Sequence, residues 1–190
     1  MITSPSTVAP RPAVFLDRDG VINEVSVRDG TPIPPRTLAD VRLIAGVPEA
    51  CSRLHELGYT LVVITNQPDI ARGTQTRDEV DRMHTFLRQR LPLDEIVVCP
   101  HDDVDGCECR KPKPGMILDA ARRLNLDLRS SFSVGDRWRD VEAAQRAGVP
   151  AIYIERHYGE RPAVGAQAVV ASLIEALPFI EANHLQGTTT

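Results

Sequence analysis

The stretch AVFLDRDG, residues 13–20, joins a short apolar run to two acids one residue apart. The segment from Ala13 to Asp17 has the apolar content of a strand that is buried on both faces. Asp17 and Asp19 then stand at the end of that strand, where they need a cation, or one of them must hold a proton. By itself, a D-x-D-G sequence after a strand is about as often a turn or a helix cap as a functional site. The rest of the sequence has to decide between these interpretations.

Apolar runs alternate with helical patterns along the rest of the chain. Strands are predicted over residues 13–17, 60–65, 95–99, 132–136, 151–154 and 168–172. Helical spacing covers residues 47–57, 77–90, 115–124 and 139–147, and the amphipathic segment 171–180 is expected to cover the sheet. This alternation predicts an α/β fold with a doubly wound, mostly parallel sheet and helices on both faces. The gaps between the motifs leave no room for a large cap domain.

The length of 190 residues indicates one domain that is large enough for its own core. We expect a disordered lead over residues 1–12, a single domain over residues 13–183 and a frayed tail over residues 184–190. We expect a monomer, with which the small size of the fold and an open site are compatible.

Composition and charge exclude several classes of function. The net charge of −4 provides no field that would attract a nucleic acid. No apolar run is long enough to span a membrane, and the first residues lack the basic start and apolar middle of a secretory signal. We therefore expect a cytoplasmic protein with a small-molecule partner, no nucleic-acid partner and no membrane association.

Polar side chains gather at the predicted carboxyl ends of the strands, where ligands bind to sheets of this kind. They are Asp17, Asp19, Thr65, Asn66, Gln67, Cys99, His101 and Asp136. The acids suit Mg²⁺, which prefers oxygen ligands and a substrate phosphate. Thr65 and Asn66 offer donors for phosphate oxygens, and Lys111 offers a positive charge. Such a set predicts phosphoryl-transfer chemistry, in which catalysis is mainly positioning and charge neutralisation.

Four motifs in order, DRDGV, TNQ, RKP and GDR-x-x-D, resemble the haloacid dehalogenase-like phosphatases over about residues 13–154. The resemblance implies that Asp17 is the nucleophile and forms an aspartyl-phosphate. It implies that Asp19 protonates the leaving oxygen and then deprotonates the attacking water. It also implies that Thr65 and Lys111 hold the phosphoryl oxygens. A carboxylate suits the first role because it is already anionic at neutral pH.

The same resemblance implies a magnesium site. Its ligands would be the carboxylates of Asp17 and Asp136 and the backbone carbonyl of Asp19. Asp140 has two possible roles, since it could contact the water shell of the metal or cap the helix that follows it.

A second motif, C-x-H-x5-C-x-C, comprises Cys99, His101, Cys107 and Cys109. Three thiolates and one imidazole suit a closed, tetrahedral, structural Zn²⁺ site. The alternatives are unrelated surface residues or a redox pair at Cys107 and Cys109. Chance is a poor explanation, because three of the four cysteines fall within one short loop. The fourth, Cys51, is expected to be a small buried side chain.

The zinc-binding loop narrows the resemblance to the branch that contains the D-glycero-D-manno-heptose-1,7-bisphosphate phosphatases and the histidinol-phosphate phosphatases. TNQPDIARG, residues 65–73, is similar to the TNQSGIARG of the heptose enzymes, with Pro68 and Asp69 in place of Ser-Gly. RKPKPGM is also similar to that group. The five residues between His101 and Cys107 are instead as few as in the histidinol-phosphate enzymes. We favour removal of the 7-phosphate of a heptose 1,7-bisphosphate, a step in nucleotide-activated heptose biosynthesis.

A bisphosphate carries a second anionic group that needs cations. Arg110 follows the last zinc ligand and suits bidentate contacts with phosphate. Arg28, Arg72 and Arg137 are further candidates, although an isolated surface arginine is more often only solvated. By resemblance, residues 25–28 line the sugar pocket. The residues expected to bind substrate are Val25, Ser26, Val27, Arg28, Asn66, Gln67, Arg110 and Arg137.

Other functions stay open. The substrate could be histidinol phosphate or a nucleic-acid 3′-phosphate, and the acidic net charge argues against the latter. A phosphotransferase would use the same aspartyl-phosphate. A catalytically silent, zinc-stabilised binding module would have lost Asp17, Asp19 or Asp136, and all three are present. His84 lies in a helical pattern without a partner motif and is expected at the surface.

Overall fold

A six-stranded parallel sheet forms the centre of the computed structural model, which describes the backbone of residues 9–187 and the side chains of residues 9–183. Its strand order is β5-β4-β1-β6-β7-β8, and every neighbouring pair is parallel. The strands are β1 (Ala13–Leu16), β4 (Thr60–Asn66), β5 (Glu95–Cys99), β6 (Phe132–Gly135), β7 (Ala151–Ile154) and β8 (Ala168–Val170). All six lie where the sequence predicts them.

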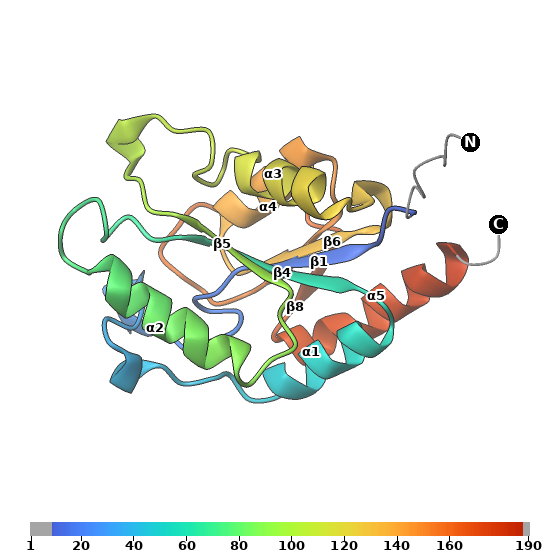
Figure 1. The fold of residues 1–190 in the computed structure, drawn as a ribbon, viewed down its shortest axis with the longest axis horizontal. Coiled ribbons are helices and arrows are strands. Elements are labelled where there is room, and N and C mark those ends of the chain that lie inside the picture. The colour runs from blue at the N-terminus through green and yellow to red at the C-terminus, as the bar shows by residue number, and fades with distance from the viewer. Residues whose placement is uncertain (1–8, 188–190) are drawn as a thin grey trace, which may run out of the picture.

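Helices cover both faces of the sheet, so the predicted doubly wound α/β fold is confirmed. In the view of Figure 1, α3 (Gly115–Leu124) and α4 (Trp138–Ala147) lie above the sheet. Below it lie α1 (Val47–Glu56), α2 (Arg77–Arg88) and α5 (Leu173–Gly187). Three short 3₁₀ helices complete the described elements, namely η1 (Leu38–Asp40), η2 (Asp103–Asp105) and η3 (Leu128–Ser130).

Strand β1 contributes to two hydrophobic cores at once. Val14 and Leu16 join the core formed with α1, α2 and α5, whereas Ala13 and Phe15 join the core formed with α3 and α4. All four side chains are fully buried. A central strand with helices on both faces has no solvated side, which explains why its sequence is a continuous apolar run.

The order of the strands sets the position of the site. β1 pairs with β4 on one side and with β6 on the other, so the connections reverse direction at β1. The backbone N–H of Asp17 donates to the carbonyl of Val134 over 3.0 Å. Because the strands are parallel, Asp17, Thr65 and Asp136 meet at one edge of the sheet. Ligands of doubly wound sheets bind at such a reversal point.

A β-hairpin after β1 was not predicted. Strands β2 (Ser26–Arg28) and β3 (Thr31–Ile33) pair antiparallel. Asp29 and Gly30 between them have φ values of 51° and 72°. An Asp-Gly pair with two positive φ angles is a favoured two-residue hairpin turn, and this was the available signal. The strands have only three residues each and one contains Pro32, so they carry no usable periodicity.

No large cap domain covers the sheet edge in the described part of the chain, as predicted. The segment between β1 and β4 holds the hairpin, η1 and α1, and the segment between β4 and β5 holds α2. None of the helices within residues 9–187 has the length and apolar character needed to cross a membrane.

Regular structure and backbone contacts extend beyond both ends of the expected domain. The backbone N–H of Arg11 donates to the carbonyl of Asn125 over 3.1 Å, and the carbonyl of Pro12 accepts from the backbone N–H of Thr60 over 2.9 Å. Residues 11 and 12 of the expected disordered lead are therefore held by backbone contacts, which no side-chain pattern reveals. Helix α5 continues to Gly187, into the expected frayed tail. Residues 1–8 and 188–190 lie outside the described residues, and a single domain over residues 13–183 stays a prediction.

Truncation of Leu54 tests the core formed with α1. Leu54 is fully buried, and Leu54→Ala is expected to lower the free energy of unfolding by about 2–5 kcal/mol, since it leaves a cavity. Leu118→Ala on the exposed side of α3 is the control and should change it by less than about 0.5 kcal/mol. Chemical denaturation measures both. Equal losses for the two variants would contradict the described packing.

Candidate active site and zinc site

Lys111 forms a buried ion cluster with Asp17 and Asp140 at the carboxyl edge of the sheet. Its Nζ lies 2.9 Å from Asp17 Oδ1 and 2.6 Å from Asp140 Oδ1, and it donates to the carbonyl of Ile64 over 2.9 Å. Burial acts to lower the pKa of Lys111, but the two carboxylates outweigh burial and raise its pKa above the ordinary value. The ammonium group therefore stays charged inside the protein.

The acids at this edge outnumber their buried cation. Carboxylate oxygens of Asp17, Asp136 and Asp140 all lie within 4.8 Å of one another. Three carboxylates against the one ammonium of Lys111 leave two negative charges in excess. Burial raises the pKa of Asp17 to about 6, with Asp140 and Asp19 adding to the rise and Lys111 opposing it. A divalent cation would remove this excess charge, and oxygen-only ligands suit Mg²⁺.

Asp136 offers an oxygen that is ready for such a cation. Its side chain is buried, and burial together with Asp17 and Asp140 raises its pKa. Oδ2 accepts a hydrogen bond of 2.7 Å from the hydroxyl of Tyr158. Oδ1 has no hydrogen-bond partner among the described protein atoms. A buried carboxylate oxygen without a donor is costly unless a cation occupies its free side, so the residues present fit Mg²⁺.

Two glycines make room for these acids. Gly20 has a φ of +85°, and a Cβ there would come within 1.8 Å of Asp136 Oδ2. A Cβ on Gly135 would come within 2.1 Å of the Cβ of Asp140. The backbone turns after β1 and at the end of β6 therefore approach the acids as closely as only glycine permits.

Asp140 caps a helix and pairs with a buried cation. Its Oδ2 accepts from the backbone N–H of Arg137 over 2.9 Å, which caps the start of α4. Its Oδ1 pairs with Lys111. The capping alternative from the sequence is thus present, and contact with the water shell of a metal stays a prediction.

Asp19 is held by donors on both oxygens. Arg18 donates from Nε to Oδ1 over 3.1 Å and from Nη2 to Oδ2 over 2.9 Å. Asn23 donates to Oδ1 and Gln67 donates to Oδ2, each over 2.9 Å. Burial acts to raise the pKa of Asp19, but Arg18 and these hydrogen bonds outweigh burial and lower its pKa. The carboxylate is therefore ionised near pH 7 and held in one orientation by its donors.

The TNQ end of β4 supports the site in two ways. Thr65 is buried, and its Oγ1 accepts from Gln67 Nε2 over 2.9 Å. Asn66 was predicted to bind substrate, yet its amide is engaged with the backbone of Lys111. Nδ2 donates to the carbonyl of Lys111, and Oδ1 accepts from its N–H, both over 3.1 Å. Asn66 lines the cavity at the site and also fixes the position of the lysine.

The four predicted zinc ligands lie together. Cys109 Sγ lies 3.3 Å from Cys99 Sγ, 3.4 Å from Cys107 Sγ and 3.4 Å from His101 Nδ1. Zn–S bonds of about 2.3 Å in a tetrahedron place the sulfurs about 3.8 Å apart, close to these values. They are far longer than a disulfide bond of about 2.05 Å, and all the cysteines are free. The cluster therefore fits a four-coordinate Zn²⁺, which would fold the loop around itself.

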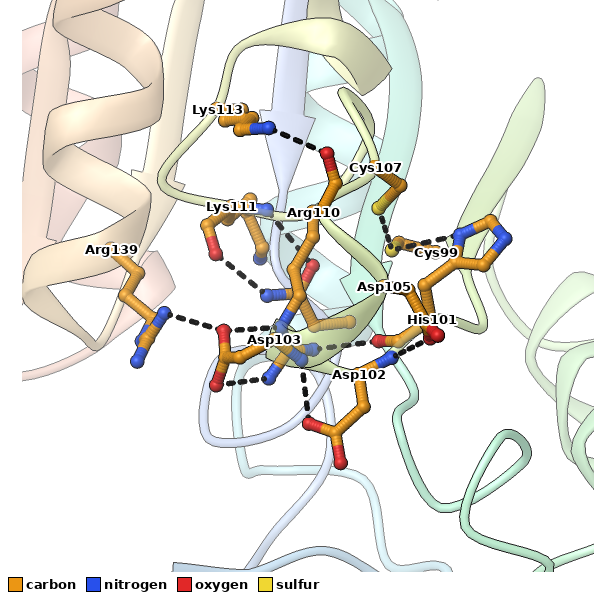
Figure 2. Close-up of polar contacts among 12 residues, drawn as sticks. Cys99, His101, Asp102, Asp103, Asp105, Cys107, Arg110, Lys111, Lys113 and Arg139 are labelled. Carbon is orange, nitrogen blue, oxygen red and sulfur yellow. Dashed lines mark hydrogen bonds and ion pairs between the residues drawn. The ribbon is translucent and has the colours of Figure 1, made fainter.

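The predicted zinc loop also brings the guanidinium group of Arg110 to the edge of the site (Figure 2). Arg110 donates from Nε to Asp103 Oδ1 over 2.8 Å and from Nη1 to the carbonyl of His101 over 3.2 Å. Arg139 reaches the same Asp103 oxygen over 3.3 Å from α4. Gly106 ends the short helix η2 with a φ of 61°, a left-handed conformation that glycine adopts without strain. The loop thus joins the zinc ligands to the rim of the site.

A cavity of about 300 Å³ opens at the strand edge. Every residue predicted for a catalytic or magnesium role lines it, and so do Val25, Asn66, Gln67, Arg110 and Arg137. Ser26, Val27 and Arg28 do not, because they form the exposed strand β2. Thr31, Pro32 and Pro34, which come after them in the chain, line this side of the cavity instead. Of the predicted residues 25–28, only Val25 lines the cavity, and the second strand of the hairpin and the residue after it line this side instead.

The other two cavity arginines also have carboxylate partners. Arg137 donates to Glu160 through Nε over 3.1 Å and through Nη2. Arg72 makes a bidentate pair with Asp102, over 2.6 and 2.8 Å, which ties the IARG segment to the zinc loop. A ligand that uses either arginine must share it with an existing partner.

Several residues that shape the site were missed or misplaced. They are Arg18, His84, Tyr158, Glu160 and Arg139. His84 was expected at the surface, yet its side chain is 3% exposed and contacts Arg18. The signal was present, because His84 shares a helix face with Val80, Met83 and Leu87, all of which are buried.

Comparison with known proteins places this geometry in a family. A model of the haloacid dehalogenase-like hydrolases matches residues 36–148. The chain belongs to this family. The D-glycero-beta-D-manno-heptose-1,7-bisphosphate 7-phosphatase of Rhodopseudomonas palustris is 40% identical over 158 residues, which are 76% of this chain and 84% of that relative. The enzyme of the same name from Escherichia coli is 38% identical over 150 residues, 73% of this chain and 75% of that relative.

A solved structure supports the same assignment to the haloacid dehalogenase-like hydrolases. The D,D-heptose 1,7-bisphosphate phosphatase of B. bronchiseptica, crystallised with magnesium and phosphate, is 33% identical with a TM-score of 0.76. The match covers 90% of this chain and 99% of that one. The predicted fold and family are confirmed, and the chain is an enzyme of the hydrolase class.

The zinc ligands can be tested by removing one of them. Cys107→Ser is expected to lose bound zinc and to lower the Tm by roughly 5 °C or more, because a structural metal contributes free energy of folding. Metal analysis and thermal unfolding measure the two effects. Cys51→Ala, which changes the cysteine outside the cluster, should keep its zinc. A zinc-free Cys107→Ser protein that melts like the unmodified protein would contradict a structural role.

Magnesium binding is expected to depend on pH through Asp17. In metal-free protein its pKa is raised from 3.8 to about 6, so the native state binds a proton that the unfolded chain has released. Stability of the metal-free protein should therefore fall as pH rises from about 4 to about 6. Above about pH 6 the ionised acid is free to bind Mg²⁺. The rise in Tm on adding Mg²⁺ should be larger at about pH 7.5 than at about pH 5.

Differential scanning fluorimetry with and without Mg²⁺ tests this dependence. Asp17→Asn is the control and should reduce the difference between the two pH values, because it removes one of the titrating carboxyl groups, while Asp136, whose pKa is also raised, remains. An equal Mg²⁺ effect at both pH values in the unmodified protein would show that Asp17 does not compete with protons for the metal.

Proposed function

We propose that the protein is a Mg²⁺-dependent phosphatase that removes the 7-phosphate of D-glycero-β-D-manno-heptose 1,7-bisphosphate, in nucleotide-activated heptose biosynthesis. The observation that carries the proposal is the contact of Asp17 with Lys111 beside the other acids of the site. This contact supports a role for Asp17 as an anionic nucleophile beside a fixed cation, at a cavity whose acids would suit a divalent metal. The names of the relatives support the choice of substrate and anomer.

In the first half-reaction, Asp17 attacks the phosphorus and forms an aspartyl-phosphate. Asp19 gives a proton to the leaving sugar oxygen, for which its position beside Asp17 is suited. Lys111 and Thr65 hold the phosphoryl oxygens. Asp17, Asp136 and the carbonyl of Asp19 would hold Mg²⁺, which would neutralise the charge that otherwise keeps carboxylate and phosphate apart.

In the second half-reaction, Asp19 accepts a proton from water, and that water attacks the phosphorus of the aspartyl-phosphate. The P–O bond to Asp17 breaks, which releases inorganic phosphate and restores the Asp17 carboxylate. The low pKa of Asp19 in the resting site means that Asp19 must gain a proton before the first step. An arriving phosphate dianion raises the pKa of a neighbouring carboxyl group, because it disfavours a further negative charge.

The rim of the cavity supports a small, doubly phosphorylated substrate. Arg72, Arg110, Arg137 and Arg139 line it, and within the described residues no cap covers it. The short zinc loop favours a second candidate, histidinol phosphate, which carries one phosphate and a cationic side chain. Such a substrate gives the rim arginines no anion to bind, and for this reason we favour the bisphosphate.

Phosphate release with Mg²⁺ tests the proposal. The substrates are both anomers of heptose 1,7-bisphosphate, histidinol phosphate and a 3′-phosphorylated oligonucleotide. The β-bisphosphate is expected to have the highest kcat/KM, and Asp17→Asn should reduce it at least about a thousandfold, because an amide is not a nucleophile. Asp78→Asn, on the exposed face of α2, is the control and should leave activity unchanged.

The other outcomes separate the alternatives. A preference for histidinol phosphate would contradict the heptose assignment but not the phosphatase. No release above the Asp17→Asn blank on any substrate would contradict the phosphatase and favour a phosphotransferase or a binding module.

A further inference from the structure

A buried chain of contacts connects helix α2 with Asp19. Arg18 is 1% exposed, and its Nε and Nη2 both donate to the carboxylate of Asp19. Its third nitrogen, Nη1, lies 3.1 Å from Nε2 of His84. His84 comes from α2, does not line the active-site cavity and so cannot touch a bound substrate.

Only one assignment of donor and acceptor is possible in the contact between Arg18 and His84. A guanidinium group has only donors, so Nε2 of His84 must accept, and the ring must be neutral with its proton on Nδ1. Burial, together with the positive charge of Arg18, lowers the pKa of His84 to about 3. The ring is therefore neutral near pH 7, and its Nε2 is present as an acceptor.

We propose that His84 is a positioning residue that acts through Arg18 to orient Asp19 for proton transfer. The proposal rests on the function proposed above. Arg18 donates to both oxygens of Asp19. The orientation of its guanidinium group, and so of the Asp19 carboxylate, depends on where Nη1 is held. Asn23 and Gln67 each hold one oxygen through a single amide hydrogen bond. Without His84, Arg18 loses its described anchor on α2 and the carboxylate loses its fixed orientation.

A change in leaving group separates this role from a merely structural one. A sugar alkoxide is a poor leaving group and needs a proton from Asp19, whereas p-nitrophenolate leaves without one. The ratio of kcat/KM for a sugar phosphate to kcat/KM for p-nitrophenyl phosphate therefore reports on the acid in the first half-reaction. A general loss of stability lowers the amount of active enzyme for both substrates equally and leaves the ratio unchanged.

The experiment compares three variants of His84 in the full chain with Mg²⁺. His84→Leu removes the acceptor, and His84→Asn keeps an amide that is too short to reach Arg18. Both should lower the sugar-to-aryl ratio roughly tenfold, a part of the 10²–10⁴-fold that general acid catalysis contributes. His84→Gln extends an oxygen toward the position of Nε2 and should restore most of the ratio.

Val80→Ala is the matched control, because Val80 is fully buried one turn earlier on α2 and its truncation should lower the Tm alone. If His84→Leu does not fold, the comparison of the Asn and Gln variants decides. A ratio that is unchanged in His84→Asn, or equally low in His84→Asn and His84→Gln, would overturn the proposal. Failure of the proposed function is a separate result, in which the unmodified protein hydrolyses neither substrate.

Discussion

The buried ion pairs of Lys111 with Asp17 and Asp140 are the constraint on which the rest of the site depends. Charges taken out of water destabilise a protein unless partners and hydrogen bonds compensate them. Here the carbonyl of Ile64 takes a third contact of the ammonium group, and Asn66 holds the backbone of the same residue. If all three acids are ionised, their charge exceeds that of the one ammonium group, and a divalent cation would compensate the excess.

The candidate zinc cluster and Lys111 are parts of one segment. The geometry of Cys109 fits a zinc ligand, and Lys111 follows it after one intervening residue, Arg110. An ion that fixes Cys109 therefore limits how far Lys111 can move from Asp17. Larger members of a fold can order such a loop by packing another domain on it. This loop is held by local cross-links instead, which lets a short chain keep its cavity open.

The sequence was most informative for site residues that lie directly at the ends of strands. The strand ends predicted Asp17, Thr65 and Asp136, because parallel strands bring their carboxyl ends together whatever lies between them. It was least informative for contacts between distant segments. Arg18 contacts His84, which lies 66 residues later, and the sequence around neither residue indicates this contact. By resemblance, the sugar-pocket wall was placed on residues 25–28, and the sequence could not correct this, since hairpin strands of three residues each leave no periodic pattern.

The partners of the rim arginines have a consequence for how ligands arrive. The cavity lining contains six acids, Asp17, Asp19, Asp69, Asp103, Asp136 and Asp140, and five bases, Arg72, Arg110, Lys111, Arg137 and Arg139. With one divalent cation bound, its summed charge is close to zero. Fields from nearly balanced charges decay over a short range, so they add little to the rate of diffusional encounter. The association rate should then depend weakly on ionic strength. The enzyme would discriminate between ligands mainly through their dissociation rates.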